Sequence, residues 1–247
     1  LFRSDYPGFN LRIAKWSKVL GFKNHYYISP QIWAWKESRI KEIKRDIDKM
    51  YVILPFEKTF YEDKHHFPVS FVGHPLIDAI QAHPVIDDAT FRKENQLNDL
   101  PIIALLPGSR KQEITKMLSV MLSVADDFKR YQFVIAGAPS QEYSFYQQFI
   151  TSDNIKFLSN KTYDLLQHAT AALVTSGTAT LETALFKVPE VVCYKGNWIS
   201  YQIAKRIITL KYISLVNLIM DKEVVTELIQ DDCTTKRIAS ELQKILD

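Results

Sequence analysis

The chain has 247 residues, of which 47% are hydrophobic and 24% charged, a composition typical of a folded globular protein and not of a disordered or fibrous one. Its formal net charge of +3 is too small to indicate nucleic-acid binding, but it suits anionic ligands or an anionic surface. Cys193 and Cys233 are the two cysteines, and their wide spacing predicts neither a zinc site nor a disulfide framework, which favours a reduced, cytoplasmic protein.

The first part of the chain predicts a small α/β arrangement. Short apolar runs predict strands and apolar periodicity predicts helices. The strands cover residues 26–29, 50–54 and 71–72, and the helices cover residues 9–20 and 31–45. The polar stretch 81–99, with Pro84 and several aspartates, predicts a linker.

In the second part, strands and helices alternate at the lengths of a parallel α/β sheet. Ile102–Leu106 is a continuous apolar run that ends at Pro107-Gly108, as in a strand buried on both faces. Further strands are expected over 133–136, 155–158, 171–175 and 190–194, and helices over 118–128, 141–150, 162–168 and 178–186. This alternation predicts a doubly wound sheet, followed by a mostly helical tail from residue 198.

The turn after the first strand of this sheet has residues suited to a phosphate. Gly108 permits close backbone approach, Ser109 offers a hydroxyl and Arg110 a planar guanidinium. An ordinary turn with a surface arginine explains the same residues equally well.

A second turn, over residues 175–182, gives a stronger signal. It follows a predicted strand and opens a helix, where free amides and the helix dipole favour an anion. Its candidate ligand-binding residues are Ser176, Gly177, Thr178, Thr180 and Glu182, the last suited to a ribose diol. The alternative is a capped helix after a glycine turn, and two phosphate-type loops in one sheet favour the ligand.

Each of three further patterns, acidic or aromatic, allows both a functional and a structural interpretation from the residues alone. Asp5 follows a strand, where a carboxylate can act as a general base, but its spacing fits a helix N-cap better. Asp46 and Asp48 have metal-ligand spacing, although a solvated helix end is favoured. Trp33 and Trp35 precede several basic residues, as in membrane-surface helices, although a solvated helix with buried tryptophans is favoured.

Seven short motifs, taken in order, resemble the lipid-A-disaccharide synthase family. They are Asp5–Asn10, Ser29–Trp35, Leu54–Glu57, Phe71–Pro75, Leu106–Arg110, Ser176–Glu182 and Ser214–Ile219. Each is modest alone, but together they cover almost the whole chain.

The resemblance implies a GT-B fold with two Rossmann-like domains. It places a partial acceptor-side domain at 1–95, a UDP-sugar-binding domain at 96–200 and a helical tail at 201–247 that packs towards the first domain or a partner subunit. The family's opening Gly-Glu-x-Ser-Gly-Asp loop has no counterpart here, so the first domain is expected to lack its N-terminal part.

The resemblance also implies an activity. The family transfers 2,3-diacylglucosamine from its UDP derivative to the 6-hydroxyl of 2,3-diacylglucosamine 1-phosphate (lipid X), with inversion, giving the β-1,6 lipid A disaccharide 1-phosphate and UDP. It implies no metal cofactor, no nucleic-acid partner, peripheral association with the cytoplasmic face of the inner membrane, and a homodimer as one arrangement.

The family's functional residues are carried over by motif. Asp5 matches the proposed base, Arg110 and Asn217 match residues near UDP, and Glu182 would bind the ribose. The turn from Ser176 to Thr180 would hold the diphosphate beside Gly108 and Ser109. Two alternatives stay open: a GT-B enzyme like UDP-N-acetylglucosamine epimerase, and a non-catalytic fragment that binds UDP.

Overall fold

The computed structural model describes residues 6–196 and 211–247. Among these, the chain divides between Ala79 and Ile80 into two units, the first formed by residues up to 79 and the second by residues 80–196 and 211–247. None of the described helices combines the length and the apolar character needed to cross a bilayer.

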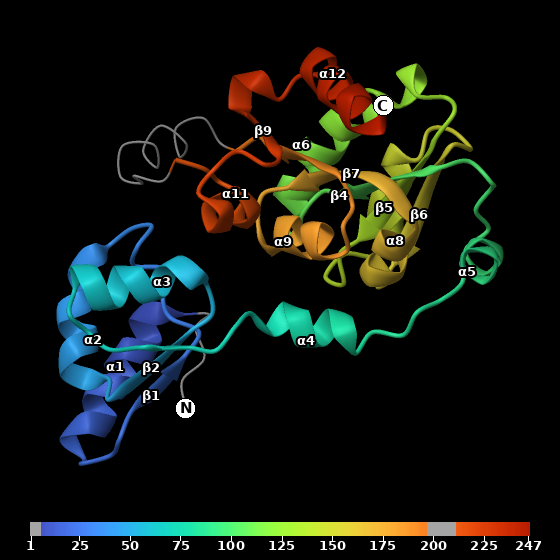
Figure 1. Cartoon of the computed structure of the whole chain (residues 1–247). Coiled ribbons are helices and arrows are strands. Elements are labelled where there is room, and N and C mark those ends of the chain that lie inside the picture. Colours follow the sequence, from blue (N-terminus) through green and yellow to red (C-terminus); the bar gives the residue numbers. More distant parts are fainter. Residues whose placement is uncertain (1–5, 197–210) are drawn as a thin grey trace. The chain divides into compact units, whose positions relative to one another are not determined.

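The first unit is built on a short parallel sheet (Figure 1). Its strands are β1 (His25–Tyr27), β2 (Lys49–Val52) and β3 (Ser70–Phe71), in that order. Its helices are α1 (Pro7–Val19), η1 (Glu37–Arg39), α2 (Ile40–Asp46), α3 (Pro55–Thr59) and η2 (Phe60–Lys64), with α4 (Pro75–Gln81) at the boundary between the units. Leu11 and Ala14 of α1 and Ile43 of α2 pack on Tyr26 and Met50 of the sheet to form the core.

The helix predicted over 31–45 begins only at Glu37, so the prediction was wrong for residues 31–36. Trp33 is held in a turn, because its indole Nε1 donates a 3.1 Å hydrogen bond to Glu57 Oε1 and its ring meets the edge of Phe56. Lys36 has a φ of 55°, which interrupts a right-handed helix. Contacts with α3, distant in sequence, therefore override the local helical pattern.

The second unit contains a six-stranded parallel sheet with the order β6-β5-β4-β7-β8-β9. The strands are β4 (Ile102–Leu106), β5 (Gln132–Gly137), β6 (Ile155–Ser159), β7 (Ala169–Thr175), β8 (Glu190–Tyr194) and β9 (Thr226–Ile229). In chain order the pattern is 3-2-1-4-5-6, the doubly wound order that binds nucleotides where the direction of winding reverses. Here that point lies between β4 and β7.

Helices cover both faces of this sheet (Figure 1). Ile103 and Leu105 pack towards α6 (Lys111–Leu122) and α12 (Thr235–Leu246), whereas Ile102 and Ala104 pack towards α5 (Asp88–Glu94) and α8 (Thr162–His168). The remaining helices are η3 (Ala125–Asp127), α7 (Tyr143–Tyr146), η4 (Gln147–Phe149), α9 (Thr178–Leu185), α11 (Leu215–Met220) and η5 (Gln230–Asp232). All five residues of β4 are buried, as a central parallel strand requires.

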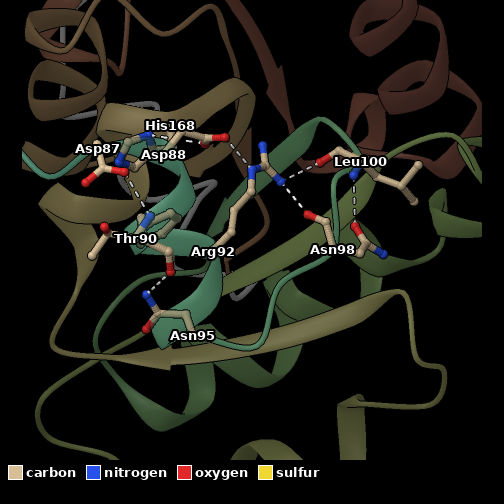
Figure 2. A network of polar contacts seen from close by, with 9 residues as sticks. Asp87, Asp88, Thr90, Arg92, Asn95, Asn98, Leu100 and His168 are labelled. Atoms are coloured by element: carbon tan, nitrogen blue, oxygen red, sulfur yellow. Dashed lines mark hydrogen bonds and ion pairs between the residues drawn. The ribbon is translucent and has the colours of Figure 1, made fainter.

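The stretch expected to be a linker contains α5, which belongs to the second unit. Phe91 is fully buried in the core of that unit and stacks on His168 at 4.5 Å. Figure 2 shows Arg92 bound to Asp88 and to the backbone carbonyls of Asn98 and Leu100. One buried aromatic ring and one arginine thus fix a segment whose composition resembles a linker.

Residues 211–247 also belong to the second unit and are not wholly helical. β9 pairs in parallel with β8, placing Thr226 beside Val191, and α12 packs on the sheet through Ile238 and Leu242. The expectation was a helical tail that packs towards the first domain or a partner subunit; the described part of the tail instead adds a strand to the sheet of the second unit.

Cys193 of β8 and Cys233 after η5 belong to the same core, and the Cys193 thiol donates to the Val191 carbonyl at 3.8 Å. Both are free and buried. Contact with Cys233 and burial raise the pKa of Cys193. The two thiols therefore influence each other, which their wide separation in the sequence did not indicate.

Candidate functional site

A cavity of about 250 Å³, here called the β4–β7 pocket, opens at the carboxyl ends of β4, β5 and β7. It is lined by Leu106, Gly108, Ser109, Glu113, Ala136–Pro139, Thr162, Thr175–Ala179 and Glu182. It lies where the strand order reverses, the position expected for a ligand in an open α/β sheet. Six predicted residues meet there: Gly108, Ser109, Ser176, Gly177, Thr178 and Glu182.

The loop between β4 and α6 is shaped by Gly108. Its φ of +100° is strained for other residues, and a Cβ there would lie 2.6 Å from the carboxyl carbon of Glu113. The Glu113 carboxylate accepts a 3.2 Å hydrogen bond from the Ser109 amide, while the Ser109 carbonyl accepts one from Ser140 Oγ. Glycine therefore lets Glu113 fold back over the loop and fix it.

The turn between β7 and α9 places backbone rather than hydroxyl groups at the pocket. Gly177 has a φ of +151° and nothing within 4 Å of a Cβ position, so the chain there is open to a ligand. The Thr180 hydroxyl is buried and donates to the Gly177 carbonyl at 2.9 Å, and the Ser176 hydroxyl donates to the Ile213 carbonyl at 2.9 Å. What this turn offers an anion is mainly the N-terminus of α9 and the exposed Thr178.

Asn217 lies behind this turn, in a buried network rather than on the pocket surface. Its Nδ2 donates to the Val225 carbonyl and to Glu227, and its Oδ1 accepts from the amides of Val224 and Val225. Every hydrogen-bonding position of its side chain is thus in use. In this structure Asn217 can affect a ligand through the backbone that it positions.

Glu227 is the centre of that network. Its carboxylate accepts hydrogen bonds from the amides of Ile213 and Ser214 at 2.9 Å each, and from Ser214 Oγ at 2.7 Å. Since the Ile213 carbonyl binds Ser176, Glu227 connects the segment before α11 to the pocket turn.

Glu182 lies on α9 with its carboxyl half-buried beside Tyr163 of α8. Burial raises the pKa of Glu182, and the hydrogen bond from the Tyr163 hydroxyl to Oε1, 3.0 Å long, opposes that rise. Burial raises the pKa of Tyr163 to about 12, so the tyrosine remains a donor at neutral pH. The pocket therefore contains an oriented carboxylate that can accept hydrogen bonds from a diol.

Arg110 lines a neighbouring cavity of about 350 Å³, here called the basic pocket. The pocket is lined by Arg110–Glu113, Lys116, Met117, Thr175 and Tyr194–Gly196. Glu113 and Thr175 line both pockets, so the two are adjacent.

The remaining predictions are not brought into this site. Asp5 lies outside the described residues. Asp46 pairs with Arg45, and Asp48 pairs with Lys18, which lowers its pKa. The described residues contain no cluster of three His, Cys, Asp or Glu side chains placed to hold a metal ion.

Glu113, Tyr163, Glu227 and Lys195 were not predicted as site residues. Glu113 occupies the third position of α6, where an acidic residue commonly binds free amides, so its position was a usable signal. Glu227 and Tyr163 act through partners 13 to 19 residues away, and no local pattern indicates such contacts.

Comparison with known proteins decides the family. The lipid-A-disaccharide synthetase family matches residues 1–247, the entire chain. A lipid-A-disaccharide synthase from Syntrophus aciditrophicus is 42% identical over 249 residues, covering 98% of this chain and 64% of that protein.

The chain belongs to the lipid-A-disaccharide synthetase family. It spans a little under two thirds of the length of the Syntrophus family member.

Solved structures support the α/β, GT-B type of fold. A UDP-N-acetylglucosamine 2-epimerase, described as putative, from Listeria monocytogenes has a TM-score of 0.64 at 11% identity, covering 96% of this chain and 63% of that one. Anabaena HepE, solved with UDP and glucose, has a TM-score of 0.57 at 13% identity, covering 97% of this chain and 66% of that one. At such identities the likeness concerns the fold alone, and this lipid-A-disaccharide synthetase family member shares that fold with both proteins.

Proposed function

We propose that the protein transfers 2,3-diacylglucosamine from its UDP derivative to the 6-hydroxyl of lipid X, forming the β-1,6 disaccharide 1-phosphate and UDP. The observation that carries this proposal is the β4–β7 pocket, which lies at the reversal of strand order in a chain that matches the synthetase family from end to end. Family membership selects the substrates, and the pocket supplies a place for the nucleotide.

Each residue has a role in this proposal. Glu182 accepts hydrogen bonds from the ribose, and the Gly177 turn and the N-terminus of α9 face the diphosphate. Asp5 removes the proton of the acceptor hydroxyl as its oxygen bonds to the anomeric carbon, while the bond from that carbon to the UDP oxygen breaks. A single displacement of this kind inverts the anomeric configuration.

The proposed location is the cytoplasmic face of the inner membrane, with the enzyme peripheral and either monomeric or homodimeric. The segment from Trp33 to Arg39 supports this, since Trp35 is 43% exposed and Lys36 lies 4.5 Å from its ring. An exposed aromatic ring beside cations suits an anionic headgroup layer. Flotation with anionic vesicles tests the membrane contact, and sedimentation tests the oligomeric state.

The decisive experiment combines calorimetry with UDP and a mass-spectrometric assay for the disaccharide. UDP binding together with disaccharide formation supports the proposal. UDP binding without product supports the alternative of a UDP-binding fragment, and conversion of UDP-N-acetylglucosamine to its epimer would favour the epimerase. An Asp5→Ala variant should bind UDP with unchanged affinity and form no product; retained turnover would remove Asp5 as the base.

A further inference from the structure

The charges around the two adjoining pockets differ sharply. The basic pocket is lined by four cationic side chains, Arg110, Lys111, Lys116 and Lys195, and one carboxylate, Glu113. The β4–β7 pocket is lined by two carboxylates, Glu113 and Glu182, and by no cation among the described residues. A molecule that carries charge at one end only is therefore matched when its neutral end lies in the β4–β7 pocket.

Carboxylates do not neutralise the four cations. Within residues 6–196 and 211–247, none of them forms an ion pair with a carboxylate; Lys111 Nζ lies 5.4 Å from the Phe145 ring centroid, and Lys195 Nζ donates to a backbone carbonyl. Glu113, the carboxylate in the lining, is engaged with the Ser109 amide. Four cations around one hollow repel each other, and an anion between them relieves that repulsion.

Two further features of the basic pocket favour an anion. It opens at the N-terminus of α6, a 12-residue helix whose first amides have no acceptor within the helix. Thr175 is 2% exposed and lines the same pocket, and its hydroxyl has no hydrogen-bond partner in the described parts of the chain. A buried hydroxyl without a partner is costly unless a ligand or solvent satisfies it.

Lys195 enters this pocket from a different element than the other cations. It follows β8 directly, and its Nζ donates to the Cys233 carbonyl at 3.4 Å, which holds the long side chain near the sheet. Gly196 lets the backbone after Lys195 pass close to Tyr194, since a Cβ at this position would lie 2.9 Å from the Tyr194 hydroxyl. The ends of β8 and α6 thus bring Lys195 and Arg110 to one cavity.

We propose that the basic pocket holds the diphosphate of UDP, and that Lys195 is a phosphate-binding residue that acts with Arg110 on the leaving group. This rests on the proposed function. The uncharged uridine then occupies the β4–β7 pocket, and the diphosphate passes the Gly177 turn and the N-terminus of α9 and extends past Thr175 into the basic pocket. Negative charge that develops on the β-phosphate as the glycosidic bond breaks is met by fixed cations from two sides.

The test compares UDP with uridine, which lacks the phosphates, by calorimetry on the 247-residue chain. Lys195→Met should weaken UDP binding about tenfold and leave uridine binding unchanged, and Lys195→Arg should restore most of the loss. Added salt should weaken UDP binding less in Lys195→Met than in the unaltered chain. Lys129→Met is the matched control, because this exposed lysine precedes the amino end of β5, whereas the basic pocket is lined by residues that follow the carboxyl ends of strands.

Other outcomes overturn the inference in distinguishable ways. If Lys195→Met keeps full UDP affinity, the diphosphate does not use this pocket. If it weakens uridine as much as UDP, Lys195 has only a structural role. If it spares UDP but weakens glucosamine 1-phosphate binding in the presence of saturating UDP, the pocket serves the acceptor phosphate instead. If the unaltered chain binds neither UDP nor uridine, the proposed function fails first and this inference falls with it.

Discussion

The Tyr163 hydroxyl donates a 3.0 Å hydrogen bond to Glu182 Oε1 and leaves Oε2 without a hydrogen-bond partner among the described residues. The tyrosine ring is itself held, with His83 at 5.3 Å and Phe186 at 5.2 Å between ring centroids. His83 is fixed in turn by Asp164 at 2.6 Å. One carboxylate oxygen of the pocket is thus tied to α8, and the other is open to a ligand.

Tyr163→Phe should change the pH dependence of UDP binding. The tyrosine hydrogen bond lowers the pKa of Glu182, so its loss raises that pKa further. Ribose hydroxyls bind the ionised carboxylate better, so on acidification the variant should lose UDP binding at a higher pH than the unaltered chain does. Calorimetry across the acidic range measures this shift. Tyr143→Phe, an exposed tyrosine of α7, is the control, and coincident pH profiles for both variants would contradict the role of Tyr163.

Gly108→Ala should destabilise the protein and weaken UDP binding. The new Cβ must displace the Glu113 carboxylate, and the alanine must adopt a positive φ. Together these two effects should lower the free energy of unfolding by roughly 2 to 4 kcal/mol. Urea unfolding measures the cost. The double variant Gly108→Ala, Glu113→Ala removes the clash and should retain only the backbone part. If the changes in the free energy of unfolding from the two substitutions simply add in the double variant, the two residues do not interact.

Glu227→Gln should lower the free energy of unfolding by about 2 kcal/mol. The carboxylate accepts from two amides and a hydroxyl, and a glutamine side chain turns an NH₂ group towards one of those donors. UDP affinity should fall as well, because the segment that binds Ser176 loosens. Glu223→Gln, an exposed residue before the same strand, should change neither quantity. Unaltered urea unfolding of Glu227→Gln would show that the network is dispensable.

Glu190→Gln should flatten the pH dependence of stability. Glu190 is 3% exposed at the start of β8, neither carboxyl oxygen has a described hydrogen-bond partner, and burial raises its pKa to about 9. The folded chain therefore binds this proton more tightly than the unfolded chain does, so stability is highest below the unfolded pKa and falls as pH rises towards 9.

The amide should remove that fall and stabilise the protein by roughly 3 kcal/mol at pH 7. Urea unfolding at several pH values measures the slope, and Glu142→Gln, at an exposed position, should leave it unaltered. An equally steep slope in Glu190→Gln would exclude this carboxyl as its source.

The fold of the second unit was predictable where burial alone determines the pattern. Strands such as Ile102–Leu106 are apolar throughout and end at Pro or Gly, and those signals are local. β9 was missed because Thr226–Ile229 is a short edge strand whose pairing with β8 depends on residues more than 30 positions earlier. The turn at Trp33 was missed for a similar reason, since Glu57 holds it.

In the candidate site, too, some features follow from local sequence signals and others depend on long-range contacts. Glycine turns after strands identify the Gly108 and Gly177 loops, because backbone geometry demands glycine there. The support of those loops by Glu113 and Glu227, and of Glu182 by Tyr163, depends on contacts between groups that no local pattern predicts. Asn217 was predicted to lie near UDP, whereas in the described structure its amide is used within the fold.

The pairing of β9 with β8 has a consequence for the exposed edge of the sheet. Without residues 211–247, β8 would present a full row of unpaired amides and carbonyls at the border of the sheet, the kind of border to which strands of other molecules add. β9 offers a shorter border of four residues, and Glu227 on it is already committed to Ile213 and Ser214. The same strand that anchors the ligand-facing turn therefore also covers β8 and shortens the edge of the sheet.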